Sequence, residues 1–338
     1  MRKIVAVLPG CLLLITAAFA GGDASLAPKI LAYDERFHDF IDVDSRVEIL
    51  GANLGWAEGP VWVESLDSLL FSDVASDTIF RWDESRGLSP YLKPSGHPPD
   101  DAGHAWRGSN GLAVDAAGRL LLAQQGNRVL SRMRAAITEP ASDFELLAGH
   151  YQGKRINSPN DLVVHAAGDI YFTDPPYGLA GFENSPDREL QFSGVFRLTA
   201  GGQLSLIEDE IEKPNGIALS VDQSVLFVSN SEVGQAQVFA FALDAKGNAA
   251  SRRVFFDARA LEATGPGSTD GMAMHRLDYL FVTIPNGFGI LSPQGDLLGK
   301  VALGQVTNLA FDDAFEYLYL TTPERLLRIQ LNLRAGDG

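Results

Sequence analysis

The stretch Lys213-Pro214-Asn215-Gly216-Ile217-Ala218-Leu219 decides the fold of this chain. Pro-Asn-Gly is a turn-forming tripeptide, and the apolar residues after it predict a short strand. The same unit, a turn that carries one carboxylate or carboxamide and then a strand, recurs five more times. One copy would be a weak signal, but six copies predict a repeated architecture.

The polar residue that defines each copy recurs at a regular spacing. These residues are Glu58, Asn110, Asn160, Asn215, Asp270 and Asn308. Successive copies are 50 to 55 residues apart, except for a last step of 38 residues. Each copy continues as a strand, a tight turn and a second strand, and further strands follow in several units. The last copy is the weakest, because Leu309 directly follows Asn308.

A period of about 40 to 50 residues with about four strands in each repeat is typical of β-propellers. We therefore predict an all-β fold, a single six-bladed β-propeller over residues 46–338. Only 30 residues follow Asn308, enough for about three strands. We expect the strand at 46–50 to complete the last blade and close the ring, because an open ring would expose strand edges. A β-sandwich, the alternative, would not explain six equivalent polar positions.

The composition favours a cation or a substrate of low charge as partner. The chain has 338 residues, 46% of them hydrophobic, and a net charge of −16. Such an acidic chain lacks the basic surface that nucleic acids and anionic membranes require. The one cysteine, Cys11, lies in the N-terminal apolar segment, so we expect no disulfide and no cysteine-based zinc site.

The N-terminus has the pattern of a secretory signal peptide. Met1-Arg2-Lys3 is basic, residues 4–17 are mostly apolar, and Ala18-Phe19-Ala20 has the form of a cleavage site. We expect a signal peptide over 1–20, a leader over 21–45, and an exported protein, periplasmic or secreted, with no membrane attachment after cleavage. A membrane anchor and lipidation at Cys11 are the alternatives, and the apolar run is short for a membrane span.

Equivalent residues of successive blades surround the central channel of a propeller, so the six polar residues predict a ring of two carboxylates and four carboxamides. Each Asn or Asp could be present for turn geometry alone. Glu58 is not a turn former, yet it occupies the equivalent place. Oxygen ligands favour one hard divalent cation, with Ca²⁺ preferred and Mg²⁺ or Mn²⁺ as alternatives. Zn²⁺ is less favoured, because its usual nitrogen and sulfur ligands are lacking.

Several motifs in this order resemble the gluconolactonase and regucalcin (senescence-marker protein) family over residues 30–330. The motifs are Trp-Ala-Glu-Gly-Pro-Val-Trp at 56–62, Ser-Asn-Gly-Leu-Ala-Val-Asp at 109–115, Ser-Pro-Asn-Asp-Leu at 158–162, Phe-Thr-Asp-Pro-Pro-Tyr-Gly at 172–178, Pro-Asn-Gly-Ile-Ala at 214–218 and Asp-Gly-Met-Ala at 270–273. The resemblance implies a six-bladed propeller with one catalytic divalent metal ion in its channel.

The same resemblance assigns roles to individual residues. Glu58, Asn215 and Asp270 match metal ligands, and Asn160 matches a residue that binds the metal directly or through water or substrate. Asn110 matches a position that contacts substrate.

Neighbouring positions receive weaker assignments. Tyr177 is expected at the substrate mouth, with Asp174 either beside it or in a structural loop. Asp161 is expected to orient its neighbours or to serve the turn. Asn308 is treated as structural. Pro285-Asn286-Gly287 repeats the opening tripeptide out of phase and is expected to be a plain turn.

The resemblance implies a lactonase that acts on a small sugar lactone. The metal would polarise the lactone carbonyl and Asp270 would accept a proton from the attacking water, while Asn110 and Asn160 orient sugar hydroxyls. No Gly-x-Ser-x-Gly motif is present, which argues against an acyl-enzyme. The alternatives are an aryl-esterase or phosphotriesterase on the same site, or a non-enzymatic calcium-binding propeller. The loop at 97–104 could form a lid, and the oligomeric state stays open.

Overall fold

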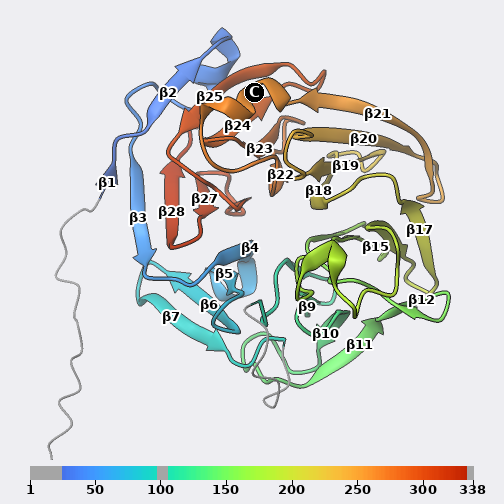
Figure 1. Cartoon of the computed structure of the whole chain (residues 1–338). Coiled ribbons are helices and arrows are strands. Elements are labelled where there is room, and N and C mark those ends of the chain that lie inside the picture. The colour runs from blue at the N-terminus through green and yellow to red at the C-terminus, as the bar shows by residue number, and fades with distance from the viewer. Residues whose placement is uncertain (1–24, 97–105, 333–338) are drawn as a thin grey trace, which may run out of the picture.

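The computed structural model describes residues 25–96 and 106–332. Six sheets stand in a ring (Figure 1), which confirms the six-bladed β-propeller. The expected signal peptide and the loop at 97–104 lie outside the described residues. Within the described part of the chain the helices are short 3₁₀ turns, and none is long and apolar enough to cross a membrane.

Every blade is an antiparallel meander, and the strands follow the predicted repeats. The first four blades are β4 (Ala57–Val63), β5 (Ser68–Asp73), β6 (Thr78–Asp83) and β7 (Gly87–Leu92); β8 (Leu112–Val114), β9 (Leu120–Gln124), β10 (Val129–Met133) and β11 (Phe144–Ala148); β14 (Leu162–Val164), β15 (Ile170–Asp174), β16 (Gly194–Leu198) and β17 (Leu204–Glu208); and β18 (Pro214–Leu219), β19 (Val225–Asn230), β20 (Gln237–Leu243) and β21 (Ala249–Asp257).

The N-terminal segment adds one strand to blade five and two strands to blade six. Blade five is β22 (Met272–Met274), β23 (Leu280–Ile284), β24 (Gly287–Leu291), β25 (Leu297–Ala302) and β2 (Lys29–Ala32); blade six is β26 (Asn308–Phe311), β27 (Tyr317–Thr321), β28 (Arg325–Gln330), β3 (Val47–Ala52) and β1 (Ser25–Leu26). A small hairpin and four 3₁₀ turns lie between strands: β12 (His150–Tyr151), β13 (Lys154–Arg155), η1 (Glu35–Asp39), η2 (Glu64–Leu66), η3 (Phe182–Asn184) and η4 (Arg259–Thr264).

Ring closure occurs as predicted. β3 pairs antiparallel with β28, with Ile49 opposite Leu327 and Val47 opposite Ile329. Arg328 of β28 reinforces this junction, because its Nε donates to Glu48 Oε2 at 2.8 Å and its Nη1 donates to Glu84 of the first blade.

The segment expected to be a separate leader, residues 21–45, instead belongs to the propeller where it is described. β2 pairs with β25, with Ile30 opposite Val301. Phe37, Phe40 and Ile41 are fully buried and pack with the core of blades five and six. The charged residues around these three apolar side chains gave the segment its polar appearance, so the polarity of the sequence hid its burial.

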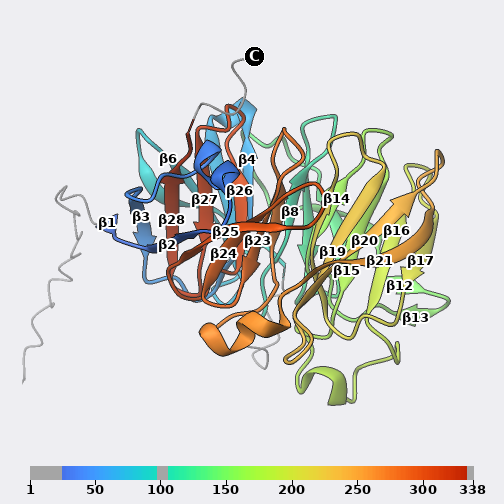
Figure 2. The ribbon, with the colours of Figure 1, turned by 90° about the horizontal axis from the view of Figure 1, so that it is seen from above.

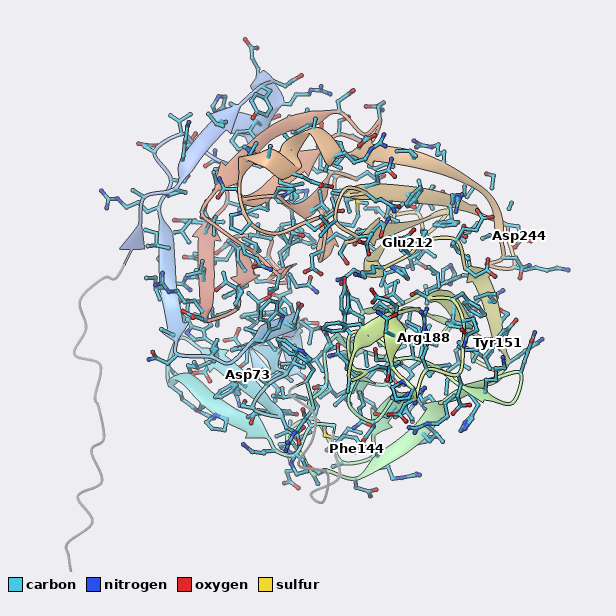
Figure 3. All side chains as sticks on the ribbon, viewed as in Figure 1. Asp73, Phe144, Tyr151, Arg188, Glu212 and Asp244 are labelled. Carbon is cyan, nitrogen blue, oxygen red and sulfur yellow. The ribbon has the colours of Figure 1, made fainter. Side chains whose placement is uncertain are left out.

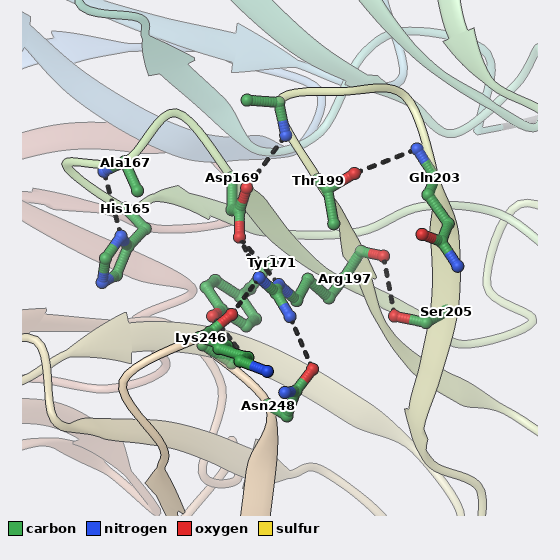
Figure 4. A network of polar contacts seen from close by, with 12 residues as sticks. His165, Ala167, Asp169, Tyr171, Arg197, Thr199, Gln203, Ser205, Lys246 and Asn248 are labelled. Carbon is green, nitrogen blue, oxygen red and sulfur yellow. Dashed lines mark hydrogen bonds and ion pairs between the residues drawn. The ribbon is translucent and has the colours of Figure 1, made fainter.

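Hydrophobic burial between blades holds the ring together. The second strand of each blade is apolar and buried on both faces, as in β9 and β15, because neighbouring blades cover it from either side. Polar ties add to this packing (Figure 4). Arg197 of blade three donates to Asp169 Oδ2 in its own blade at 2.8 Å and to Asn248 Oδ1 in blade four at 2.7 Å. Tyr171 donates its hydroxyl to Gly247 O at 2.7 Å.

The glycine after the key polar residue allows the close approach of adjacent blades. A Cβ on Gly216 would lie 2.1 Å from Asp270 O, and one on Gly59 would lie 2.3 Å from Asn110 O. The Glu-Gly, Asn-Gly and Asp-Gly pairs of the repeats therefore serve blade packing as well as turn geometry. Asn286, by contrast, lies at the turn between β23 and β24 with φ of 68°, as expected for a plain turn residue.

Candidate metal centre and active site

Five of the six repeated polar residues line one cavity in the centre of the ring. The cavity measures 380 Å³, and Glu58, Asn110, Asn160, Asn215 and Asp270 all contribute to its wall. Loops that carry η3 and η4 project from one face of the ring, visible as the yellow-green and orange coils at the lower edge of Figure 2. Phe182 of η3 also lines the cavity, so the cavity opens toward this face.

The start of the innermost strand aims each polar side chain. Register shifts interrupt the ladder between Glu58 and Val61 in blade one, and between Pro214 and Ile217 in blade four. Such bulges redirect side chains. The loop that leads into the innermost strand is held by hydrogen bonds to a residue at the end of the second strand. In blade one, Asp73 (labelled in Figure 3) accepts from Trp56 N at 2.8 Å and Gly55 N at 3.1 Å.

Two of the carboxamides are oriented by a hydrogen bond that their amide nitrogen donates. Asn215 Nδ2 donates to Ser231 Oγ at 3.2 Å, and Ser231 Oγ is 2.6 Å from the Tyr177 hydroxyl. Asn110 Nδ2 donates to Gln125 Oε1 at 2.9 Å, which leaves Asn110 Oδ1 buried without a hydrogen-bond partner. Since the amide nitrogens are already engaged, both side chains offer oxygen to a ligand.

Glu58 is buried and Asp270 is half-buried, and both have few hydrogen bonds. Glu58 accepts only long bonds, from Trp56 Nε1 and Gly59 N, both at 3.4 Å. Burial raises the pKa of Glu58 well above its ordinary value, and the charges of Asp270 and Asp161 raise it further. Burial and the charge of Asp161 likewise raise the pKa of Asp270, whose Oδ1 has no hydrogen-bond partner.

Carboxylates that repel one another in this way fit a bound cation, which would remove the repulsion. Among the described residues, no group of three or more His, Cys, Asp or Glu side chains is placed to hold a metal. A cation here would therefore need carboxamide oxygens beside Glu58 and Asp270. This donor set suits a hard ion such as Ca²⁺.

Asn308, the sixth repeated residue, lies below the cavity rather than in its wall. Its Nδ2 contacts Asp161 Oδ2 at 3.4 Å, across the ring from blade six to blade three. Both residues line a second, lower cavity of 750 Å³. Asp161 occupies the position that glycine holds in four other repeats. Burial raises its pKa to about 6, against bonds from Leu162 N and Asn308 that lower it.

The structure separates the two residues expected at the mouth. Tyr177 lines the cavity, and Lys213 Nζ lies 6.0 Å from its ring centroid. Asp174 is fully buried and accepts from Asn157 N and Ser158 N, both at 2.7 Å, so it holds the loop before Asn160. Burial raises its pKa to about 7.

The sequence analysis missed several residues of the cavity wall. They are Trp56, Val74, Trp106, Gln125, Phe182, Ser231, Val233, Gly267, Ser268 and Gln305. Trp56 stood inside a quoted motif, two residues before Glu58, but it was given no role. Gln125 and Ser231 follow Asn110 and Asn215 by 15 and 16 residues, directly after the second strand of each blade, so their equal place in the repeat could have indicated them.

Comparisons with known proteins agree with this geometry. Residues 56–324 match the family described as SMP-30/Gluconolactonase/LRE-like region. A gluconolactonase of Zymomonas mobilis is 35% identical over 315 residues, which are 91% of this chain and 87% of that protein. The pentonolactonase XacC of Haloferax volcanii is 24% identical and covers 82% of this chain and 84% of its own length.

A solved structure shows the same architecture. The gluconolactonase XC5397 of Xanthomonas campestris superposes with a TM-score of 0.76 at 31% identity, covering 91% of this chain and 96% of its own. Regucalcin of Agrobacterium tumefaciens, at 15% identity and a TM-score of 0.66, supports the fold alone, over 84% of this chain and 94% of its own. The chain belongs to the SMP-30/gluconolactonase/LRE-like family.

Proposed function

We propose that this protein is a divalent-metal-dependent hydrolase that opens sugar lactones. The observation that carries the proposal is the convergence of Glu58, Asp270 and oxygen-presenting carboxamides in one cavity of a gluconolactonase-family propeller. The 35% sequence identity to a gluconolactonase, over 91% of this chain, supports lactone hydrolysis as the reaction.

The metal would be held by Glu58, Asn160, Asn215 and Asp270. A divalent cation bound there would polarise the lactone carbonyl and stabilise the negative charge that develops on its oxygen. Oxygen donors with two carboxylates favour Ca²⁺, with Mg²⁺ or Mn²⁺ as alternatives.

Asp270 would act as the general base. One of its oxygens has no partner in the protein and is therefore free to accept a proton from water. As the water oxygen bonds to the carbonyl carbon, Asp270 accepts one proton from that water. When the ring C–O bond breaks, the proton passes to the ring oxygen, which becomes a hydroxyl of the product acid.

Asn110 and Tyr177 would position the substrate. Asn110 Oδ1, buried and unpaired, can accept a hydrogen bond from a sugar hydroxyl. Tyr177 presents its ring to the cavity, because its hydroxyl is engaged by Ser231. The carboxamide of Asn160, in the same wall, would contact either the metal or a substrate hydroxyl.

The test is acid release from glucono-δ-lactone in a pH-stat, with the spontaneous rate subtracted. We expect activity that chelator abolishes and added Ca²⁺ restores, and a loss of at least about 100-fold in kcat for Asp270→Asn. Asp67→Asn is the matched control, since Asp67 is exposed and its left-handed backbone (φ 46°) accommodates asparagine. Full activity after chelation, or in Asp270→Asn, would refute the mechanism.

The same assay separates the alternatives. Faster hydrolysis of aryl esters or phosphotriesters than of any lactone would favour an esterase on this site. Calcium binding without any hydrolysis would favour a binding protein. The signal-peptide pattern of residues 1–20 supports the further proposal that the protein is exported.

A further inference from the structure

The outer wall of the cavity is apolar and open to solvent. Phe182 is 43% exposed and Val233 is 85% exposed, and both line the cavity that holds the candidate metal ligands. Two aromatic pairs continue this surface inward. Trp56 meets Trp106 edge to face at 5.1 Å between ring centroids, and Tyr177 meets Phe182 in the same manner at 6.2 Å.

The turn that carries Val233 is anchored, so this side chain is held in solvent. Glu262 of η4 accepts from Gly234 N at 2.8 Å and from Ala236 N at 3.0 Å, which fixes the turn that presents Val233. Phe182 itself adopts a left-handed backbone, with φ of 53°. A bulky residue rarely takes this conformation, and such strain is concentrated at functional sites.

Hydrogen-bonding groups line the same cavity as the apolar side chains. Ser268 Oγ is buried and has no partner, and Gln305 lines the cavity beside it. Among the described lining residues the only charged side chains are the carboxylates Glu58 and Asp270. A ligand for this outer region should therefore be neutral, with an apolar face and several hydroxyl groups. An alkyl chain would leave the polar groups unused.

Volume also favours a ligand larger than one lactone ring. The cavity measures 380 Å³, and cavities of about 300–1,000 Å³ enclose ligands of drug size. The two ends differ in chemistry, with carboxylates and carboxamides around the candidate metal centre and aromatic rings at the mouth.

Resting on the lactonase activity proposed above, we propose that the mouth is a subsite for a second sugar ring. The preferred substrates are then lactones of disaccharide acids. The lactone ring reaches Asp270, while the second ring packs its C–H face against Phe182 and Val233. Hydroxyl groups of the second ring donate hydrogen bonds to Ser268 and Gln305. Because the turn at Val233 is already anchored, less conformational entropy is lost when the second ring binds there.

The experiment compares kcat/KM for cellobiono-δ-lactone, glucono-δ-lactone and an alkyl-substituted δ-lactone. We expect the wild type to prefer the disaccharide lactone over glucono-δ-lactone by about tenfold. In the double variant Phe182→Asn, Val233→Ser this ratio should fall to about one. Asparagine suits the left-handed backbone at 182. Val254→Ser is the matched control, because Val254 is 47% exposed on β21, outside the cavity, and its ratio should stay at the wild-type value.

Each outcome decides the proposal. A wild-type ratio near or below one, or a double variant that keeps the wild-type ratio while its thermal unfolding is normal, overturns the sugar subsite but leaves the lactonase activity standing. A preference for the alkyl lactone over the disaccharide lactone overturns it in favour of an apolar subsite. Failure to hydrolyse any lactone would instead overturn the activity on which the subsite rests.

Discussion

The buried carboxylate of Asp161 should make the metal-free protein lose stability as pH rises. Its pKa is raised by burial from an ordinary 3.8 to about 6. The folded protein therefore binds this proton more tightly than the unfolded chain does. Below about pH 4 the group is protonated in both states and carries no penalty; above about pH 6 it is ionised in both, and the folded state bears the full cost of the buried charge.

The difference of about 2 pKa units corresponds to about 3 kcal/mol in the free energy of unfolding. Asp161→Asn removes this charge while keeping an acceptor for Leu162 N, which donates to Asp161 Oδ1 at 2.9 Å. It also places two amide groups face to face at Asn308, at a cost of about 1 kcal/mol that does not depend on pH. The pH dependence, rather than the absolute stability, is therefore the quantity to measure.

The assay is urea unfolding between pH 4 and pH 7.5 in the presence of chelator, followed by tryptophan fluorescence. Relative to the variant, the wild type should lose about 3 kcal/mol across this range. Saturating Ca²⁺ should shrink the difference, because a nearby cation favours the ionised carboxylate. Asp67→Asn serves as control and should follow the wild-type profile. Parallel pH profiles for wild type and Asp161→Asn would refute the assignment of a buried, raised-pKa carboxyl below the cavity.

Three further predictions concern the ring, the metal ligands and the substrate. Gly216→Ala should destabilise the fold by about 1–3 kcal/mol and weaken cation binding, because its Cβ would lie 2.1 Å from Asp270 O. The control Gly202→Ala has nothing within 4 Å of its new Cβ and should cost only about 1 kcal/mol, for its backbone conformation. Equal melting temperatures for the two variants would contradict this prediction. Ser231→Ala should weaken Tb³⁺ or Ca²⁺ binding by about tenfold, because it releases the Asn215 amide. The control is Ser205→Ala, which should leave cation binding unchanged, because Ser205 bonds Arg197 O in blade three. Unchanged binding in Ser231→Ala would refute the orienting role of Ser231. A phosphorylated sugar lactone should react at least about tenfold more slowly in kcat/KM than its neutral parent, since the described lining residues include two carboxylates and no cationic side chain, and equal rates would speak against this cavity as the active site.

The repeats made the ring predictable, because residues at the same position within each repeat lie at equivalent positions around the central axis of the propeller. Glu58 and Asp270 are far apart in the chain, yet their equal place in the repeat was enough to predict one shared wall. The closing strand was predictable for a related reason, since a blade lacking one strand and a strand lacking a partner imply each other.

The same logic explains Asn308, which has the equivalent place in its repeat but does not line the cavity of the candidate metal centre. Its repeat lacks the glycine that lets neighbouring blades approach, and its side chain contacts Asp161 below the cavity instead. Asp161 was equally hard to interpret, because a carboxylate in the glycine position has no counterpart in the other repeats. Some residues of the cavity wall outside the six repeated positions could not be predicted from the sequence for a different reason. Phe182 and Val233 come from loops whose path depends on long-range contacts rather than on periodicity.

The junction between the two ends of the chain has a consequence for how the protein matures. Thr307 of the last repeat donates a hydrogen bond to Ala57 O, next to Glu58, at 2.6 Å. The N-terminal strand β3 pairs with β28, which lies at the other end of the sequence. Glu58 thus reaches Asp270 only after nearly the whole chain has been synthesised and the ring has shut. Cation affinity would then act as a checkpoint on assembly, because a molecule arrested before closure has an incomplete set of ligands.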